Sequence, residues 1–134
     1  MKYAEENPDG VTKADVIIGI PSFNEAPSIS FPTTQADKGL VKYYKDRSAV
    51  IINCDNNSDD GTREAFLATS TQTPKIYVST EPGVKGKGAN LRNLFLKAVE
   101  LGAHAIVVAD ADLKSITPLW IRNLCEPIFD NYDF

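Results

Sequence analysis

Two carboxylates separated by a single residue follow an apolar run late in the chain. Asp110 and Asp112 come directly after Ala105–Ala109, a run typical of a buried strand. Carboxylate oxygens suit Mg²⁺ or Mn²⁺, which commonly keep water ligands and bridge to substrate phosphates. A D-x-D pattern is also common in turns and helix caps. Its position at the end of a core strand is what indicates a metal site.

A glycine- and lysine-rich segment has the composition of a phosphate-binding loop. The segment Gly83–Gly88 reads G-V-K-G-K-G and precedes a run with helical periodicity. Its backbone N–H groups, the ammonium groups of Lys85 and Lys87 and the helix N-terminus that follows all favour a phosphate or diphosphate. The pattern GxxxxGK[ST] fails because Glu81 occupies the first glycine position, and GxGxxG fails because Leu91 occupies the last. A dinucleotide cofactor is therefore disfavoured, and an exposed loop with solvated lysines is the alternative.

Four apolar runs of strand length recur, and segments with helical character lie between them. The runs are Asp15–Ile20, Ala49–Cys54, Lys75–Ser79 and Ala105–Ala109. The first helical segment is poorly marked, and residues 39–45 form its end. The other helical segments are 60–68, 89–101 and one that starts near 117. Three of the runs are rich in Val and Ile without strict alternation, which is typical of strands covered on both faces. The alternation predicts an α/β fold with a Rossmann-like mostly parallel sheet and flanking helices.

Helix-ending signals are clearest in the second half of the chain. Gly102 follows Leu101 and suits the left-handed conformation that ends many helices. Thr117 and Pro118 are expected as the N-cap and first residue of the last helix. Pro127 is expected to bend or shorten that helix.

Polar residues follow the predicted strands. Because the carboxyl ends of parallel strands share one edge of a sheet, we expect Asn24, Asp55 and Asp110 to project from neighbouring strand ends into one crevice. Asp55 is the first residue after its strand and is a candidate for ligand contact. Ordinary turn structure explains Asn57, Ser58 and Asp59 as well as a functional role does. Like charges at one edge are costly unless a cation or hydrogen-bond donors join them, which favours a cation-assisted site.

Length and charge exclude several classes of protein. With 134 residues and 43% hydrophobic content, the chain suits one globular domain, which we place at 14–134 after a polar leader, 1–13. A net charge of −4 argues against a surface for double-stranded nucleic acid. The apolar stretches are far shorter than the roughly 20 residues that cross a bilayer, and no signal-peptide core is present. We expect a soluble, cytoplasmic protein without a transmembrane segment.

The two cysteines and the single histidine are assigned no chemistry, and Arg92 has two interpretations. Cys54 and Cys125 are far apart in sequence, so two buried thiols are favoured over a disulfide or zinc site. His104 precedes the fourth strand, at the end opposite the predicted site, and is interpreted as a structural or surface residue. Arg92 either supports the site by pairing with a carboxylate or makes a structural ion pair.

Together the motifs resemble, in order, the amino-terminal half of family 2-type GT-A glycosyltransferases. Pro21–Glu25 matches the P-x-[FY]-N-E stretch, and Asp55–Thr62 resembles the D-[DN]-x-S-x-D-G-T turn with one residue extra or shifted. Gly86–Asn93 resembles the GKGxAxxRN-type segment, and Asp110–Asp112 is the DxD motif. The resemblance covers roughly residues 14–134. The Lys-Gly-Lys-Gly loop and the Asn-Tyr-Asp-Phe ending are most similar to glucosyl-3-phosphoglycerate synthases and mannosylglycerate synthases.

The resemblance implies a metal-dependent hexosyltransferase. It would transfer sugar from a nucleotide-diphosphate donor, of UDP-glucose or GDP-mannose type, to a hydroxyl acceptor such as phosphoglycerate or glycerate. Pro21 and Glu25 would border the nucleoside and Asp55 would hydrogen-bond the base. Lys87 would contact the diphosphate. Asp110 would contact the ribose or the metal, and Asp112 would ligate Mg²⁺ or Mn²⁺.

Two other functions stay open, and the length of the chain adds an expectation of its own. A nucleotidyltransferase shares the fold type and the metal, but usually has a Gly-rich basic loop after the first strand, where this chain has Pro-Ser-Phe-Asn-Glu. A non-catalytic nucleotide-binding module is the second alternative.

Members of the resembled family carry further segments, so we expect this chain to stop before the acceptor-binding part and the catalytic residues. We therefore expect it to be inactive alone and to self-associate through uncovered apolar surface.

Overall fold

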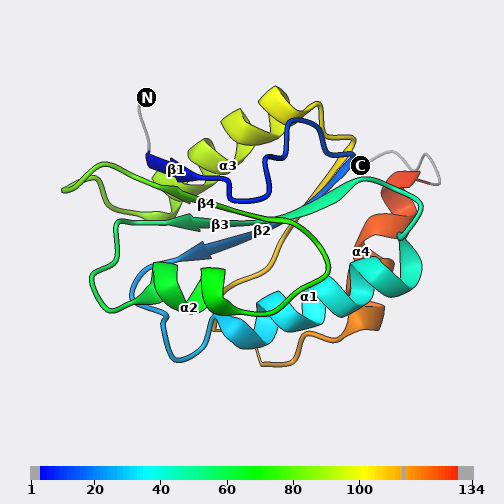
Figure 1. Ribbon diagram of the computed structural model, residues 1–134, viewed down its shortest axis with the longest axis horizontal. Coiled ribbons are helices and arrows are strands. Elements are labelled where there is room, and N and C mark those ends of the chain that lie inside the picture. Colours follow the sequence, from blue (N-terminus) through cyan, green and yellow to red (C-terminus); the bar gives the residue numbers. More distant parts are fainter. Residues whose placement is uncertain (1–3, 113, 130–134) are drawn as a thin grey trace.

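A computed structural model describes residues 4–112 and 114–129 and contains one five-stranded sheet between helices (Figure 1). The strands are β1 Ala4–Glu6, β2 Val16–Ser22, β3 Ala49–Asp55, β4 Lys75–Ser79 and β5 Ala105–Val108. Their order across the sheet is β1-β4-β3-β2-β5. The pairs β4-β3, β3-β2 and β2-β5 are parallel, and β1 pairs antiparallel with β4. The predicted mixed α/β architecture with a mostly parallel sheet is confirmed.

In the described ranges, four helices connect or follow the strands. They are α1 Ser30–Tyr43, α2 Thr62–Ala68, α3 Lys87–Leu101 and α4 Pro118–Phe129. Gly102 ends α3 in the left-handed conformation, with φ 71°, as predicted. Thr117 Oγ1 accepts a hydrogen bond from Trp120 N at 3.3 Å, which confirms its capping position before α4. Pro127 lies inside α4 and the helix extends two residues beyond it, so it does not end the helix.

The helices cover both faces of the sheet, and each face has its own core (Figure 1). On one face α1, α2 and α4 pack on alternate strand residues; this core includes Ile18, Ile20, Ile51, Leu40, Phe66 and Ile121. On the other face α3 packs on the residues between; this core includes Ile17, Val50, Ile52, Ile76, Leu94 and Ala98. Burial on both faces explains why the strand sequences lack alternation.

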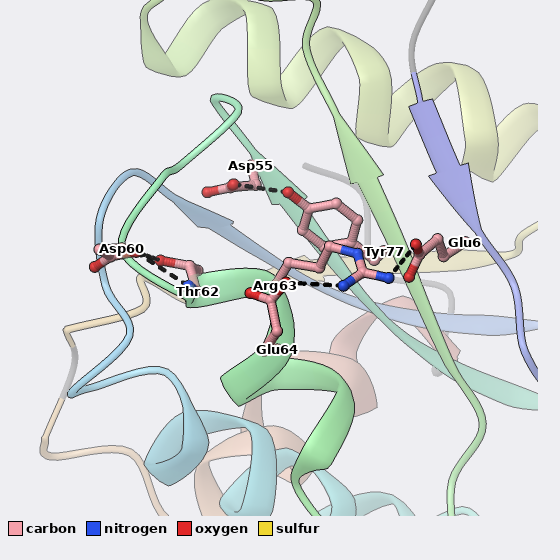
Figure 2. Close-up of polar contacts among 7 residues, drawn as sticks. All are labelled: Glu6, Asp55, Asp60, Thr62, Arg63, Glu64 and Tyr77. Atoms are coloured by element: carbon pink, nitrogen blue, oxygen red, sulfur yellow. Dashed lines mark hydrogen bonds and ion pairs between the residues drawn. The ribbon is translucent and has the colours of Figure 1, made fainter.

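The predicted polar leader contributes a strand. β1 has no buried residue, and it is held at the sheet edge by backbone pairing and by ion pairs on both sides. Glu5 pairs with the buried Lys97 of α3 at 2.6 Å, and Glu6 pairs with Arg63 of α2 (Figure 2). One alanine and two glutamates carry no hydrophobic period, which is why the sequence did not reveal this strand.

Both cysteines are free and buried, as expected. Burial raises the pKa of the Cys54 thiol to about 12 and that of Cys125 to about 11, so both are held as neutral thiols. Among the described residues, no helix is long and apolar enough to cross a membrane.

Candidate functional site

A crevice of about 360 Å³ lies at the carboxyl ends of β2 and β5, beside the N-terminus of α3. Its lining comes from four segments that are distant in sequence. The lining residues are Pro21, Ser22, Phe23, Glu25, Asn56, Lys87, Asn90, Asp110, Ala111 and Asp112. Five of the six residues predicted to bind donor or metal therefore line one crevice. The sixth, Asp55, does not.

Opposite charges meet in this crevice. Lys87 Nζ lies 2.7 Å from Asp110 Oδ1, and both side chains are more than half exposed. An exposed ion pair of this kind contributes little to stability, so a ligand can replace either partner at small cost. Asp112 is also exposed, and Glu25 is half-buried.

The carboxylates of Asp110 and Asp112 fit a hard divalent cation. Over the described residues, no group of three or more His, Cys, Asp or Glu side chains is positioned to hold a metal. Mg²⁺, however, is usually bound through one or two carboxylates, with waters and substrate phosphates completing its coordination. Two aspartates lining one crevice supply that donor set.

The N-terminus of α3 opens onto the crevice. Gly86 precedes the helix with φ 104°, a conformation that favours glycine, and Lys87 is the first helical residue. The first N–H groups of a helix have no intrahelical acceptor, which makes this end suitable for an anion. Two side chains hold the preceding loop: Thr80 Oγ1 donates to Val84 O at 3.0 Å and Asn56 Nδ2 to Gly86 O at 3.3 Å.

Asn90 is a crevice residue that the sequence analysis missed. Its side chain is almost fully buried, and Nδ2 donates to Ser22 O at 3.2 Å. In the described part of the chain, no donor reaches its Oδ1. A buried acceptor without a partner is costly, so this atom is a position where a ligand donor would be stabilising. The sequence could have indicated Asn90, because it lies three residues after Lys87 and therefore on the same helix face.

Phe23 is the second missed residue. It lies in the Pro21–Glu25 segment, and its ring is 47% exposed. Lys85 Nζ lies 5.7 Å from the ring centroid, within the range of a cation–π contact. An exposed aromatic ring at the rim of a polar crevice offers a surface on which a planar group can stack.

Asp55 differs from the expectation because four protein donors already surround its carboxylate. Oδ1 accepts from Ser22 Oγ at 2.6 Å and Ser58 Oγ at 2.7 Å, and Oδ2 accepts from Ser58 N and Tyr77 Oη, both at 2.8 Å. Figure 2 shows the contact with Tyr77. Burial, together with the adjacent Asp55, raises the pKa of Tyr77 well above its usual value. Asp55 thus joins three parts of the fold, and its contact with a nucleobase stays a prediction.

Asn24 and Arg92 also lie outside the crevice lining. Asn24 adopts a left-handed conformation with φ 53°, and its backbone N donates to Ser58 Oγ at 2.8 Å. This hydrogen bond ties the backbone at Asn24 to the loop after β3, while its neighbours Phe23 and Glu25 line the crevice. Arg92 is exposed on α3, and among the described residues it pairs with no carboxylate.

The loop after β2 is fixed by the loop after β3. Glu25 N donates to Thr62 Oγ1 at 2.9 Å, and Ala26 N donates to Asp60 Oδ2 at 3.1 Å. Asp60 also accepts hydrogen bonds from Thr62 (Figure 2). Burial raises the pKa of Asp60, but the hydrogen bonds from Thr62 and Ala26 outweigh it and lower the pKa below its usual value. The Asn- and Asp-rich turn thus positions the crevice residue Glu25.

Comparison with known protein families found no family model that matches this chain, and no curated protein matches it. The Asn-Tyr-Asp-Phe ending, 131–134, lies outside the described residues.

Proposed function

We propose that this chain is the donor-binding domain of a metal-dependent glycosyltransferase of the GT-A type. The observation that supports it is the crevice at the carboxyl edge of the parallel sheet. There an ammonium group, a helix N-terminus and two adjacent aspartates line one cavity. This is the position at which open α/β sheets bind ligands, and these groups match a diphosphate with a divalent cation.

Each lining group has a role in binding a nucleoside diphosphate sugar. The α3 N-terminus and Lys87 bind the diphosphate, while Asp110 and Asp112 hold Mg²⁺ or Mn²⁺. The exposed ring of Phe23 is available to stack on the base, beside Pro21 and Glu25. Asn90 Oδ1 accepts a hydrogen bond from the ligand, and the resemblance assigns Asp110 a further contact with the ribose.

The chemistry follows from where charge develops. Breaking the bond between the sugar and the diphosphate leaves negative charge on the nucleoside diphosphate. The N–H groups at the start of α3 are already in place to stabilise that charge, and Lys87 joins them by exchanging its exposed ion pair with Asp110 for the diphosphate. A bound Mg²⁺ or Mn²⁺ would neutralise part of the same charge.

The proposed donor and acceptor are based on the sequence resemblance. The donor is UDP-glucose or GDP-mannose, and the acceptor is a small hydroxyl compound such as phosphoglycerate or glycerate. The crevice described here is the donor side of such a reaction.

Equilibrium binding of nucleotides separates this function from its alternatives. UDP-glucose, GDP-mannose, UTP and GTP would each be titrated calorimetrically, with and without Mn²⁺. A donor domain binds a nucleoside diphosphate sugar more tightly than either triphosphate, and only with Mn²⁺. A preference for triphosphates would favour a nucleotidyltransferase, and binding that is indifferent to Mn²⁺ would favour a non-catalytic module.

A further inference from the structure

The outward face of α3 carries a seam of residues that no part of the described chain covers. Gly88, Arg92, Phe95 and Val99 recur at spacings of four, three and four residues, and Leu91 and Leu96 flank them. Together these six residues line a groove of about 410 Å³. Phe95 is 47% exposed, Leu96 44% and Val99 81%. Isolated exposed apolar residues are ordinary, but Phe95, Leu96 and Val99 lie together in one groove, and an exposed apolar cluster of this kind marks an interaction surface.

We propose that a second copy of this chain covers the seam, with the two α3 helices antiparallel about a two-fold axis. Spacings of four and three are those of a coiled-coil seam. The seam is symmetric about the point midway between Asn93 and Leu94. A two-fold axis through that point places Gly88 opposite Val99 of the second copy, and Arg92 opposite its Phe95. Each contact then occurs twice, as in an isologous interface.

The facing residues are complementary in size. Among the residues that the structure describes, Val99 is the most exposed large apolar one, and Gly88 has no side chain. A Cβ built on Gly88 would meet no atom within 4 Å, so the space above it is open. A Val99 side chain of the second copy would occupy that space.

The facing residues are complementary in charge as well. Arg92 is the only charged residue of the groove lining, and its guanidinium would lie against the face of Phe95, a favourable cation–π contact. A parallel pair would instead place Arg92 against Arg92, which brings like charges together, and Gly88 against Gly88, which leaves the space above both glycines unfilled. The seam therefore specifies an antiparallel partner of its own sequence.

Sedimentation velocity tests the surface. The wild-type chain at roughly 0.1 mM should sediment as a dimer. Val99→Asp should raise the dimer dissociation constant at least about a hundredfold, because the two-fold axis places two buried charges in one interface. Leu119→Asp on α4, which changes an exposed apolar residue outside the seam, is the control and should leave the dimer intact. A monomeric wild type, a dimeric Val99→Asp or a monomeric control would overturn the proposal.

Cysteine cross-linking tests the direction of pairing. Gly88→Cys and Val99→Cys chains, mixed and mildly oxidised, should form a disulfide-linked heterodimer at least about tenfold faster than either variant alone. The native cysteines are buried and do not compete. Faster cross-linking of Val99→Cys with itself would show parallel pairing and contradict the two-fold arrangement.

Discussion

Asp112 is the crevice carboxylate that makes the fewest contacts with the rest of the fold. Within the described residues, no donor or cation engages it, whereas Asp110 pairs with Lys87. Asp112→Ala should therefore abolish Mn²⁺-dependent binding of UDP or GDP and leave the unfolding temperature unchanged. Calorimetry with and without Mn²⁺ measures the first effect, and circular dichroism the second. Asp46→Ala, which removes an exposed carboxylate at the opposite end of the sheet, should change neither. Unchanged Mn²⁺-dependent affinity for Asp112→Ala would remove its role as ligand.

Lys87 and Lys85 permit a test of position within one loop. Lys87 lines the crevice, while Lys85 lies against Phe23. Lys87→Ala should weaken binding of UDP by about 1.5–3 kcal/mol, the contribution of a charged hydrogen bond. Lys85→Ala should weaken it much less. Equal losses in the two titrations would mean that the net charge of the loop, and not the position of Lys87, attracts the diphosphate.

Asp55 should be required for stability. Asp55→Asn replaces one carboxylate oxygen, an acceptor, by an NH₂ group, a donor. This donor would face either the backbone N–H of Ser58 or the hydroxyl groups that now donate to the carboxylate. An unsatisfied buried donor costs about 1–3 kcal/mol, so urea denaturation should show a loss of that size. Asp59→Asn, in the same turn but exposed, is the control and should be neutral. A variant of Asp55 with normal stability but no nucleotide binding would instead assign it a direct ligand contact.

At the scale of elements, the packing of α1 against α4 depends on one glycine. A Cβ at Gly39 would lie 2.8 Å from Ile121 Cβ and 2.9 Å from Pro118 O. Because one of these atoms belongs to the backbone, Gly39→Ala should move the helices apart and cost about 1–3 kcal/mol. Thermal unfolding measures this loss, and Lys38→Ala, at the neighbouring exposed position, is the control. A stabilised Gly39→Ala would show that its helix propensity outweighs the clash.

The elements that sequence predicted best are those with strong local signals. β4 matches its predicted bounds, and the other three apolar runs differ by at most two residues, because Val and Ile runs mark buried parallel strands. The start of α1 was not predicted, since its N-cap position is Ile29, which has no side-chain capping bond. β1 was missed because its stabilising contacts come from the distant residues Lys97 and Arg63.

The crevice was predictable in outline for a topological reason. Parallel strand ends share one edge, so the segments after β2 and β5 had to meet beside α3. The inward position of Asp55 was not predictable. It depends on the register that pairs Asp55 with Ser22 and Ser79, and on Tyr77 reaching across from β4.

At the scale of the whole molecule, α3 links the two proposed surfaces. Its first turn opens onto the crevice, and its outward face carries the dimer seam. Its inward face is anchored on β2, where Gly19 leaves room for Leu94: a Cβ there would lie 2.3 Å from Leu94 Cδ2. The position of the diphosphate site relative to the sheet therefore depends on this helix-to-sheet contact.

The central claim is that a nucleoside diphosphate and a divalent cation bind together at the carboxyl edge of the sheet. Paramagnetic broadening by Mn²⁺ in the amide spectrum of the ¹⁵N-labelled chain, recorded with UDP and with UMP, tests it most directly. With UDP, we predict broadening of the amides of Lys87–Asn90, Asp110–Asp112 and Ser22–Glu25, and none at Lys45–Ser48 at the opposite end. UMP, which lacks the second phosphate, should give much weaker broadening. Broadening centred on Lys45–Ser48, or equal effects of UDP and UMP, would contradict the proposed site.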